Sequence, residues 1–440
     1  MARAQVISQR FVLLSQAGAG GMGTVYRARD LTTNATVAIK LLSLGRPFDL
    51  ARFGREASLL ASVHHSNVVQ YIAHGESDGV HYLAQEWVAG TTLGAHMRTI
   101  GATARDAVAI ARGVAGALSA IHALGVVHRD VKPANLIVVD GDPARIKLVD
   151  FGIARHAAQN NVLTRTGIVV GTPAYMAPEQ ARGESQLDVS ADVFALGCVL
   201  YETLTGRVAF AGSTATAVRA KVLLSSPPRI SDYCPEVPAD LVALVDEMLD
   251  KHPERRLRDG AAVLARLDAL GPIPEGPTRR VGVPEPPTKE IGITTTRPQD
   301  PVEVQSYLLV AMPDEDSAPV AARAACVDKV AAEHAMNVHT LDDGVVLLAA
   351  QQAGKAGAVH AAQAALELSQ EIRDGAVALF GHPTNVELDA AVDRGAEMLD
   401  RARLTALFAP EDVNVAVDDV ISELLDGVDD AHLDSALKRK

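Results

Sequence analysis

The sequence predicts an α+β protein in which a β-rich lobe precedes a larger helical lobe, followed by a separate small α/β sandwich domain. Three observations predict this architecture. Short alternating apolar stretches fill roughly the first 90 residues. Long helical patterns dominate from Gly94 onward. A proline-rich stretch then separates off a C-terminal part in which strand and helix patterns alternate.

The N-terminal stretches alternate between apolar and polar residues, as half-buried strands do. We expect strands at Phe11–Leu14, Thr24–Arg29, Thr36–Leu41, Val68–Ala73 and Val80–Glu86, and a helix near Leu50–Ser62. Apolar residues at helical spacing predict long helices further on, for example Ala104–Leu124 and Asp192–Leu204.

The segment from Gly271 to Pro301 has eight prolines and no periodic pattern. Proline removes an amide donor and favours extended chain, so we expect a stiff, exposed tether. The alternative is a long loop inside one domain, which is uncommon at this length. We therefore divide the chain into an N-terminal tail (1–10), a main module (11–270), a linker (271–302), an acidic α/β domain (303–430) and a C-terminal tail (431–440).

The acidic domain has a mixed pattern that predicts a helix-covered sheet. We expect strands at Val304–Val310, Val338–Leu341, Gly344–Ala350, Ala376–Phe380 and Thr405–Phe408, and helices at Ala318–Glu333, Val359–Arg373 and Val386–Leu404. The pair Asp342 and Asp343 is expected to form a hairpin turn, with a metal site as the alternative.

Charge and composition exclude several classes of protein. The 440 residues carry a net charge of −13, and residues 303–440 contain 25 acidic against 10 basic side chains. This acidity argues against nucleic acid as a partner, because phosphate contacts need Lys and Arg. Three scattered cysteines indicate a reducing compartment. No signal peptide or membrane-spanning segment is apparent, so we expect a soluble, cytoplasmic protein without a membrane partner.

A glycine-rich stretch, Gly18-Ala19-Gly20-Gly21-Met22-Gly23-Thr24-Val25, lies between two expected strands. Glycines let the backbone approach phosphate oxygens and direct amides toward them. A dinucleotide-binding fold uses similar glycines, but it needs a helix directly after the third glycine, where this sequence alternates like a strand. A plain glycine-rich turn remains the other alternative.

Charged residues with a chemistry in common follow. Lys40 ends an apolar strand and offers a point charge for phosphates, with Glu56 on the next helix as its partner. Phosphoryl transfer needs a carboxylate to orient the attacking hydroxyl, for which Asp130 is suited. Asn135 and Asp150 supply oxygen ligands for magnesium. Taken singly, Lys40 and Glu56 could be solvated surface charges. Asp130, Asn135 and Asp150 could each be a turn former or a helix cap.

Together these residues fall into ordered motifs: GxGxxGxV, VAIK, HRDVKPAN, DFG and GTPAYMAPE. In this order they resemble the bacterial Hanks-type serine/threonine protein kinases over about residues 11–270, which implies a two-lobed protein-kinase fold. The resemblance implies ATP as the nucleotide and Mg²⁺, or Mn²⁺ in its place, as the cofactor.

The resemblance also implies a role for each matching residue. Asp130 is the catalytic base, Lys132 reaches the γ-phosphate, Lys40 contacts the α- and β-phosphates and pairs with Glu56, and Asn135 and Asp150 hold the metal. The remaining nucleotide contacts are in the phosphate-covering loop, on the following strand and at the hinge: Ala17, Gly18, Ala19, Gly20, Gly21, Met22, Gly23, Thr24, Val25, Ala38, Glu86 and Val88.

The activation segment implies regulation. Arg129 precedes the catalytic Asp, which in this family marks enzymes activated by phosphorylation of that segment. Thr164 and Thr166 stand where relatives often autophosphorylate, which requires at least a transient homodimer. Proteins are the implied substrates, phosphorylated on serine or threonine in signal transduction.

The order of elements after residue 303 is similar to a nucleotide cyclase homology domain. Cyclase chemistry needs two metal-binding aspartates and a phosphate clamp. Met312, or its neighbour Ala311, stands at one metal position, and Asp393 and Glu397 stand where Asn and Arg would be needed. We therefore expect a catalytically empty cyclase-like fold, or another α/β sensor or dimerisation module. The rival functions are an ATP-binding scaffold and a bifunctional kinase–cyclase.

Overall fold

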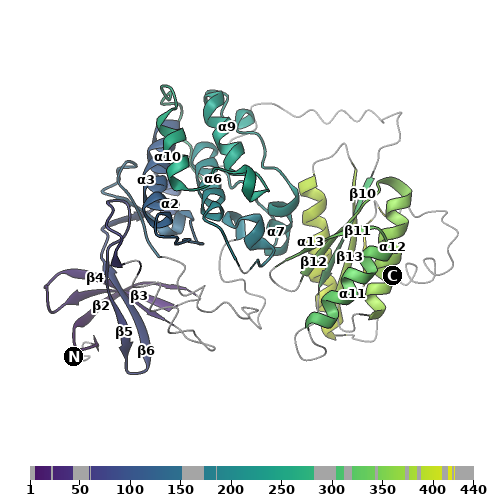
Figure 1. The fold of residues 1–440 in the computed structure, drawn as a ribbon, viewed down its shortest axis with the longest axis horizontal. Helices are drawn as coiled ribbons and strands as arrows, with labels where there is room; N and C mark the ends of the chain where they lie inside the picture. Colours follow the sequence, from purple (N-terminus) through teal and green to yellow (C-terminus); the bar gives the residue numbers. More distant parts are fainter. Residues whose placement is uncertain are drawn as a thin grey trace. The chain divides into compact units, whose positions relative to one another are not determined.

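The computed structural model describes residues 5–20, 23–42, 59, 61–150, 173–184, 186–281, 304–311, 320–341, 345–371, 376–383, 388–408, 415–418 and 421. The chain divides into two compact units. The first holds residues 1–177, 185–209 and 228–289, and the second holds residues 178–184, 210–227 and 290–440. Figure 1 labels their helices and strands along the chain.

A six-stranded antiparallel sheet opens the first unit, in the order β1-β2-β3-β4-β6-β5. Its strands are β1 (Val6–Ile7), β2 (Phe11–Gly20), β3 (Gly23–Asp30), β4 (Thr36–Leu42), β5 (Tyr71–Ser77) and β6 (Val80–Glu86). Val37 and Ile39 of β4 pack into a core on one face. Because side chains alternate along a strand, Ala38 and Lys40 lie on the opposite face. At the end of β3, Arg10 donates two hydrogen bonds to the buried carboxylate of Asp30.

The rest of the first unit is mainly helical. A small sheet of β7 (Gly90–Thr92), β8 (Leu136–Val139) and β9 (Ile146–Leu148) lies among the helices α2 (Leu93–Thr99), α3 (Ala104–His122), α6 (Ser190–Thr205), α8 (Ile230–Tyr233), α9 (Ala239–Met248) and α10 (Gly260–Asp268). Short 3₁₀ turns occur at Pro133–Asn135, Pro173–Tyr175 and Pro253–Arg255. Helix α6 is buried along its whole length, as a helix that is apolar on all sides should be. The predicted two-lobed kinase fold is thus confirmed.

Some elements differ in extent from the sequence prediction. The strand expected at Val68–Ala73 runs instead from Tyr71 to Ser77, and Val68 forms an isolated bridge with Leu148. Strand β2, expected to end at Leu14, continues into the glycine-rich stretch as far as Gly20, because its backbone pairs with β3. The helix expected near Leu50–Ser62 lies almost entirely outside the described residues.

Residues 271–281 differ from the exposed tether that their prolines suggest. Arg279 and Ala102 exchange two backbone hydrogen bonds of 2.8 and 2.9 Å, and Val281 N–H donates to Met97 O at 3.2 Å. The Arg279 guanidinium also pairs with Glu236 at 3.2 Å. The segment is mostly exposed to solvent but bound to the helical lobe, through partners distant in sequence that a local pattern does not reveal.

The second unit contains a five-stranded sheet in the order β11-β12-β10-β13-β14, antiparallel except for the parallel pair β13–β14. Its elements are β10 (Val304–Ala311), α11 (Val320–Glu333), β11 (Met336–Thr340), β12 (Val345–Ala350), α12 (Gly354–Glu371), β13 (Ala376–Pro383), α13 (Leu388–Phe408) and β14 (Val415–Val417). The same unit includes two helices from earlier in the chain, α5 (Pro178–Ala181) and α7 (Ala215–Leu224).

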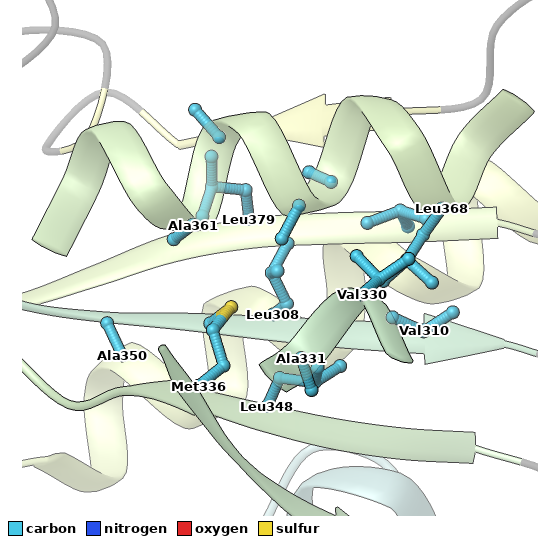
Figure 2. Packing of buried hydrophobic residues seen from close by; sticks show 14 of the residues in the cluster. Leu308, Val310, Val330, Ala331, Met336, Leu348, Ala350, Ala361, Leu368 and Leu379 are labelled. Carbon is cyan, nitrogen blue, oxygen red and sulfur yellow. The ribbon is translucent and has the colours of Figure 1, made fainter. Parts of the chain in front are cut away.

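Helices cover both faces of this sheet. On one face Leu308, Val310 and Leu379 pack beneath α12, and Val330 of α11 joins them (Figure 2). On the other face, α13 approaches so closely that a Cβ added to Gly395 would lie 2.3 Å from the Phe380 ring. The result is the predicted α/β sandwich.

The last predicted strand was wrong. Residues Thr405–Phe408 continue helix α13, and the final strand is β14. Between the predicted helix end at Leu404 and Pro410 the sequence has no Gly or Pro that would stop the helix. The expected turn at Asp342-Asp343 and the position of Met312 lie outside the described residues. Within the described part of the chain, no helix has the length and apolar character that crossing a membrane requires.

Candidate active site

The glycine-rich stretch forms the end of the β2–β3 hairpin. Gly18 pairs with Val25, Ala19 with Thr24 and Gly20 with Gly23. Gly23 has φ +142°, and a Cβ there would lie 2.0 Å from Leu41 O, so only glycine fits. Gly18 has open space around its Cα, so its lack of a side chain is not required by packing within the protein.

Lys40 is brought to this hairpin by strand pairing. It lies opposite Val25 on β3 and opposite Leu83 on β6. Its Nζ donates a hydrogen bond to the carboxylate of Asp150, and the lysine side chain is largely buried. The predicted partner Glu56 lies outside the described residues, so that pair stays a prediction. Lys40 of the sheet lobe and Asp150, which follows β9, therefore form an ion pair.

The segment after β6 provides backbone groups next to the sheet. Glu86 N–H donates to Gln70 O at 2.9 Å, and the Glu86 carboxylate binds Lys147 Nζ at 2.5 Å and Gln70 N–H at 3.0 Å. Two residues later, Val88 makes no backbone hydrogen bond with any described residue. A ligand at this edge would thus find the Val88 backbone available, while the Glu86 side chain fixes the segment to β9.

Asp130 is the centre of the catalytic loop. Its two carboxylate oxygens lie 3.1 and 2.8 Å from Lys132 Nζ. Asn135 Nδ2 donates at 2.8 Å both to the Asp130 carboxylate and to its backbone carbonyl. Lys132 and Asn135 thus hold the carboxylate in one orientation, and charge-assisted hydrogen bonds of this kind are the stronger ones.

The same contacts orient Asn135 for a cation. Because its Nδ2 donates to Asp130, the side-chain atom that remains as a ligand for a cation is Oδ1, a hard oxygen donor. Val149 N–H donates to Asn135 O at 2.9 Å, so Asp150 directly follows a residue bonded to Asn135. One amide oxygen beside one carboxylate fits Mg²⁺, which keeps several waters. Elsewhere among the described residues, no three His, Cys, Asp or Glu side chains form a group able to hold a metal.

Backbone conformation also marks these loops. Asp150 and Arg129 have φ values of 62° and 68°, in the left-handed region that non-glycine residues rarely adopt. Such residues cost about 1–3 kcal/mol each and persist only where the surrounding structure holds them. Arg129 directly precedes Asp130, and Asp150 is itself one of the two expected metal ligands.

A buried carboxylate, Asp192 at the start of α6, holds the catalytic loop. It accepts the N–H groups of His128 at 2.6 Å and Arg129 at 2.7 Å, and His122 Nε2 at 3.1 Å. Gly260 N–H donates to His122 Nδ1, so the proton of a neutral His122 is on Nε2, directed at Asp192. Burial lowers the pKa of His128, which keeps that imidazole neutral.

The role of His122 was missed by sequence reasoning, which saw only a polar residue interrupting an apolar helix. Its contact with Asp192 is 70 residues away in sequence, so no local signal marks it. Gly21, Met22, Thr164 and Thr166 lie outside the described residues.

Comparison with known proteins identifies the family of the part of the chain that carries this site. The protein kinase domain model matches residues 11–264. The chain is similar to serine/threonine-protein kinase PknB of Mycolicibacterium smegmatis, at 38% identity covering 63% of this chain and 46% of that protein. It is also similar to serine/threonine-protein kinase PrkC of Bacillus subtilis, at 36% identity covering 57% and 39%.

Among solved structures, a crystal structure of Rad53 1-466 in complex with AMP-PNP matches with a TM-score of 0.50 and 27% identity, covering 58% of this chain and 64% of that one. The chain spans about half or less of the length of the curated relatives named above. The family match ends before β10, so it does not include the C-terminal sheet domain.

Proposed function

Because the chain belongs to the protein kinase family, we propose that it is a serine/threonine protein kinase that transfers the γ-phosphate of ATP to proteins in signal transduction. One observation carries the proposal. The Asp130 carboxylate is held by Lys132 and Asn135, next to the Asp150 carboxylate that binds Lys40. A catalytic base, two cations and a metal-binding pair thus lie in neighbouring loops.

In the proposed reaction, Asp130 accepts a hydrogen bond from the serine or threonine hydroxyl and then its proton. The hydroxyl oxygen forms a bond to the γ-phosphorus, while the bond to the β–γ bridging oxygen breaks and ADP leaves. Lys132 lies close enough to Asp130 to offer its charge to the transferring phosphate. The rigid hold on Asp130 supports this role, because positioning supplies much of the catalysis in phosphoryl transfer.

ATP would be held by three elements. We propose that residues Ala17–Val25 cover its phosphates, that Lys40 and Ala38 contact the nucleotide from β4, and that the backbone of Glu86 and Val88 binds the adenine. The pairing of Gly18 with Val25, and of Val25 with Lys40, supports a common site for the loop and the lysine. Glu56 is the proposed carboxylate that holds Lys40 in the active state.

Asn135 and Asp150 would bind Mg²⁺, with Mn²⁺ as a substitute. When bound, the cation neutralises charge that develops on the phosphates. The use of Asn135 Nδ2 by Asp130, which leaves Oδ1 as the side-chain oxygen ligand, supports this assignment.

We also propose how the kinase is regulated and where it acts. Autophosphorylation at Thr164 or Thr166 in a transient homodimer would add about −1.5 to −2 charge to the activation segment. A cytoplasmic location suits the three free cysteines. The proposed division of the chain is 1–10, 11–270, 271–302, 303–430 and 431–440.

For the C-terminal domain we propose a cyclase-like fold without cyclase activity. The segment from β10 to β13 has the order βαββαβ, with β10 between β12 and β13, and this split βαβ arrangement supports the likeness. Asp393 and Glu397 replace the phosphate clamp. Assay of the full chain for cyclic nucleotide from ATP and GTP should find none, and any product that survives Asp130→Asn would contradict the proposal.

The kinase proposal is tested by incubating the full chain with labelled ATP, Mg²⁺ and a basic protein substrate. Phosphoserine or phosphothreonine should form, and Asp130→Asn and Lys40→Met should each abolish it. Asp140→Asn is a matched control, because Asp140 forms only an exposed ion pair with Arg145. Equal labelling by the wild type and Asp130→Asn would overturn the proposal.

A further inference from the structure

Helix α7 has a buried lysine that depends on another part of the chain. The Lys221 side chain is 4% exposed. Its Nζ donates to Ala211 O at 2.7 Å and to the Asp393 carboxylate at 2.7 Å, with the Asp389 carboxylate 3.9 Å away. Among the ion pairs of the described residues, both carboxylates that reach this ammonium come from α13.

Helix α13 presents these two acids on one face. Asp389 and Asp393 are four residues apart, so they lie about one helical turn apart on the same face. The second oxygen of Asp393 accepts the backbone N–H of Ser213 at 3.1 Å. Asp393 therefore uses one oxygen for a lysine and the other for a backbone donor next to α7, which fixes its orientation.

An electrostatic effect accompanies this contact. Arg182, just after α5, adds to the lowering of the pKa of His339 on β11 that burial begins. The positive charge of Arg182 must therefore be near β11, in addition to the contact at α13. One helix of the C-terminal sheet domain, α13, thus binds α7, and one strand, β11, is within the electrostatic influence of Arg182, all in the same compact unit.

The chemistry of the contact makes it sensitive to conditions. A buried ammonium without a counter-charge is costly, so Lys221 stays buried only while α13 supplies carboxylates. When the helices part, water can solvate all three charges, so neither surface is left with an unpaired buried charge. The two acids are 34% and 31% exposed, so dissolved salt reaches and screens the pair.

We propose that helix α7 is the docking site for helix α13 of the same chain, held by Lys221 with Asp389 and Asp393 and released by charge changes or high salt. This interface lies outside the family match on its α13 side and inside it on its α7 side. None of the three charged residues of this interface belongs to the proposed active site, so the test of the interface requires no kinase activity.

The test uses full-length protein and a water-soluble carbodiimide, which joins a lysine amine to a carboxylate as an amide with loss of water. Digestion and mass spectrometry should find Lys221 linked to Asp393 or Asp389, at a yield that falls at least about fivefold between about 0.05 and 1 M salt. The pair Lys329–Glu333 within α11 is the internal reference, since it does not depend on docking. Linkage of the reference without any link at Lys221 would overturn the proposal.

Charge reversal provides the second arm. Lys221→Glu and Asp393→Lys should each raise hydrogen exchange of residues 213–224 by about tenfold, because attraction becomes repulsion. Glu397→Lys is the matched control, since this exposed acid is on the same helix and should leave exchange unchanged. The double swap Lys221→Glu with Asp393→Lys should restore protection and regain a carbodiimide link between the same positions, which also shows that the variants fold.

A mixture of isotope-labelled and unlabelled protein decides whether the contact is within one chain. Cross-linked peptides that are wholly labelled or wholly unlabelled support docking within one molecule. Mixed peptides at the statistical frequency would show that a second copy supplies α13 and would overturn the proposal as stated. Exchange in both single variants equal to that of the wild type would overturn it as well.

Discussion

Replacing Asp192 by asparagine should disable the catalytic loop while leaving most of the fold intact. The carboxylate accepts hydrogen bonds on both oxygens, from the N–H groups of His128 and Arg129, and also lies 3.1 Å from His122 Nε2. An asparagine has one oxygen and one NH₂ group. Whichever way the amide is turned, its NH₂ faces an N–H donor at a site that is 1% exposed.

The magnitude follows from these contacts. A hydrogen bond to a charged acceptor contributes about 1.5–3 kcal/mol, and a buried donor left without a partner costs about 1–3 kcal/mol. We therefore expect Asp192→Asn to lower the free energy of unfolding by about 3 kcal/mol. Arg129, held at φ 68°, should relax toward an ordinary conformation and move Asp130. A displacement of about 1 Å at a catalytic group reduces kcat about 100-fold.

The assay combines urea unfolding with peptide phosphorylation. Trp87 is the sole tryptophan, so intrinsic fluorescence follows the sheet lobe and not the C-terminal domain. Asp188→Asn is the matched control, because this exposed carboxylate accepts one N–H, from Ser190 at 3.0 Å, and its loss should change stability by less than about 1 kcal/mol. If Asp192→Asn retained both the wild-type kcat and the wild-type unfolding midpoint, the reasoning about the loop would be refuted.

Three further changes should have distinct effects. Gly23→Ala should destabilise the sheet lobe by about 2–3 kcal/mol in thermal or urea unfolding, whereas Gly18→Ala, in open space, should not; equal midpoints would contradict this. Gly101→Ala puts a Cβ 2.4 Å from Arg279 O, so trypsin should cleave after Arg279 at least about tenfold faster, and an unchanged rate would mean that the segment is not held there. The hydrogen bonds from Arg10 lower the pKa of Asp30, so this pair stabilises the fold fully above the ordinary carboxyl pKa of about 4 and progressively less as the pH falls below it. In urea unfolding, the difference in free energy of unfolding between the wild type and Asp30→Asn should therefore shrink from pH 6 to pH 3.

The parts of the fold that follow local rules were predictable from the sequence. Strands that follow the predicted apolar stretches, such as β4 and β6, and helices with a clear apolar pattern, such as α3, lie within a few residues of their predicted bounds. The residues expected to act together also meet where they are described. Lys132 and Asn135 reach Asp130 because all three belong to one short loop. Lys40 reaches Asp150 across 110 residues of sequence, and only the resemblance to the ordered kinase motifs placed these two residues at one site.

Features that depend on distant partners were not predictable. Residues 271–281 have the composition of a free linker, but backbone pairing to Ala102 holds them, and pairing partners leave no trace in composition. His122 acts through Asp192, whose position is set by the packing of α3 against α6. The strand prediction at Thr405–Phe408 was wrong because the local pattern is ambiguous. A short apolar run fits a strand or the end of a helix equally well, and here the residues continue helix α13.

Asp393 illustrates how an inference about chemistry can leave the purpose of a residue unexplained. Sequence reasoning took the acid there as evidence against a phosphate clamp, because a carboxylate repels phosphate. That argument does not explain why an acid stands there in place of any neutral residue. The ion pair with Lys221 supplies a reason, since a buried ammonium on α7 needs a counter-charge and a neutral side chain would leave it unpaired. The charge that makes α13 unsuitable for binding a nucleotide phosphate is thus the charge that suits it to bind α7.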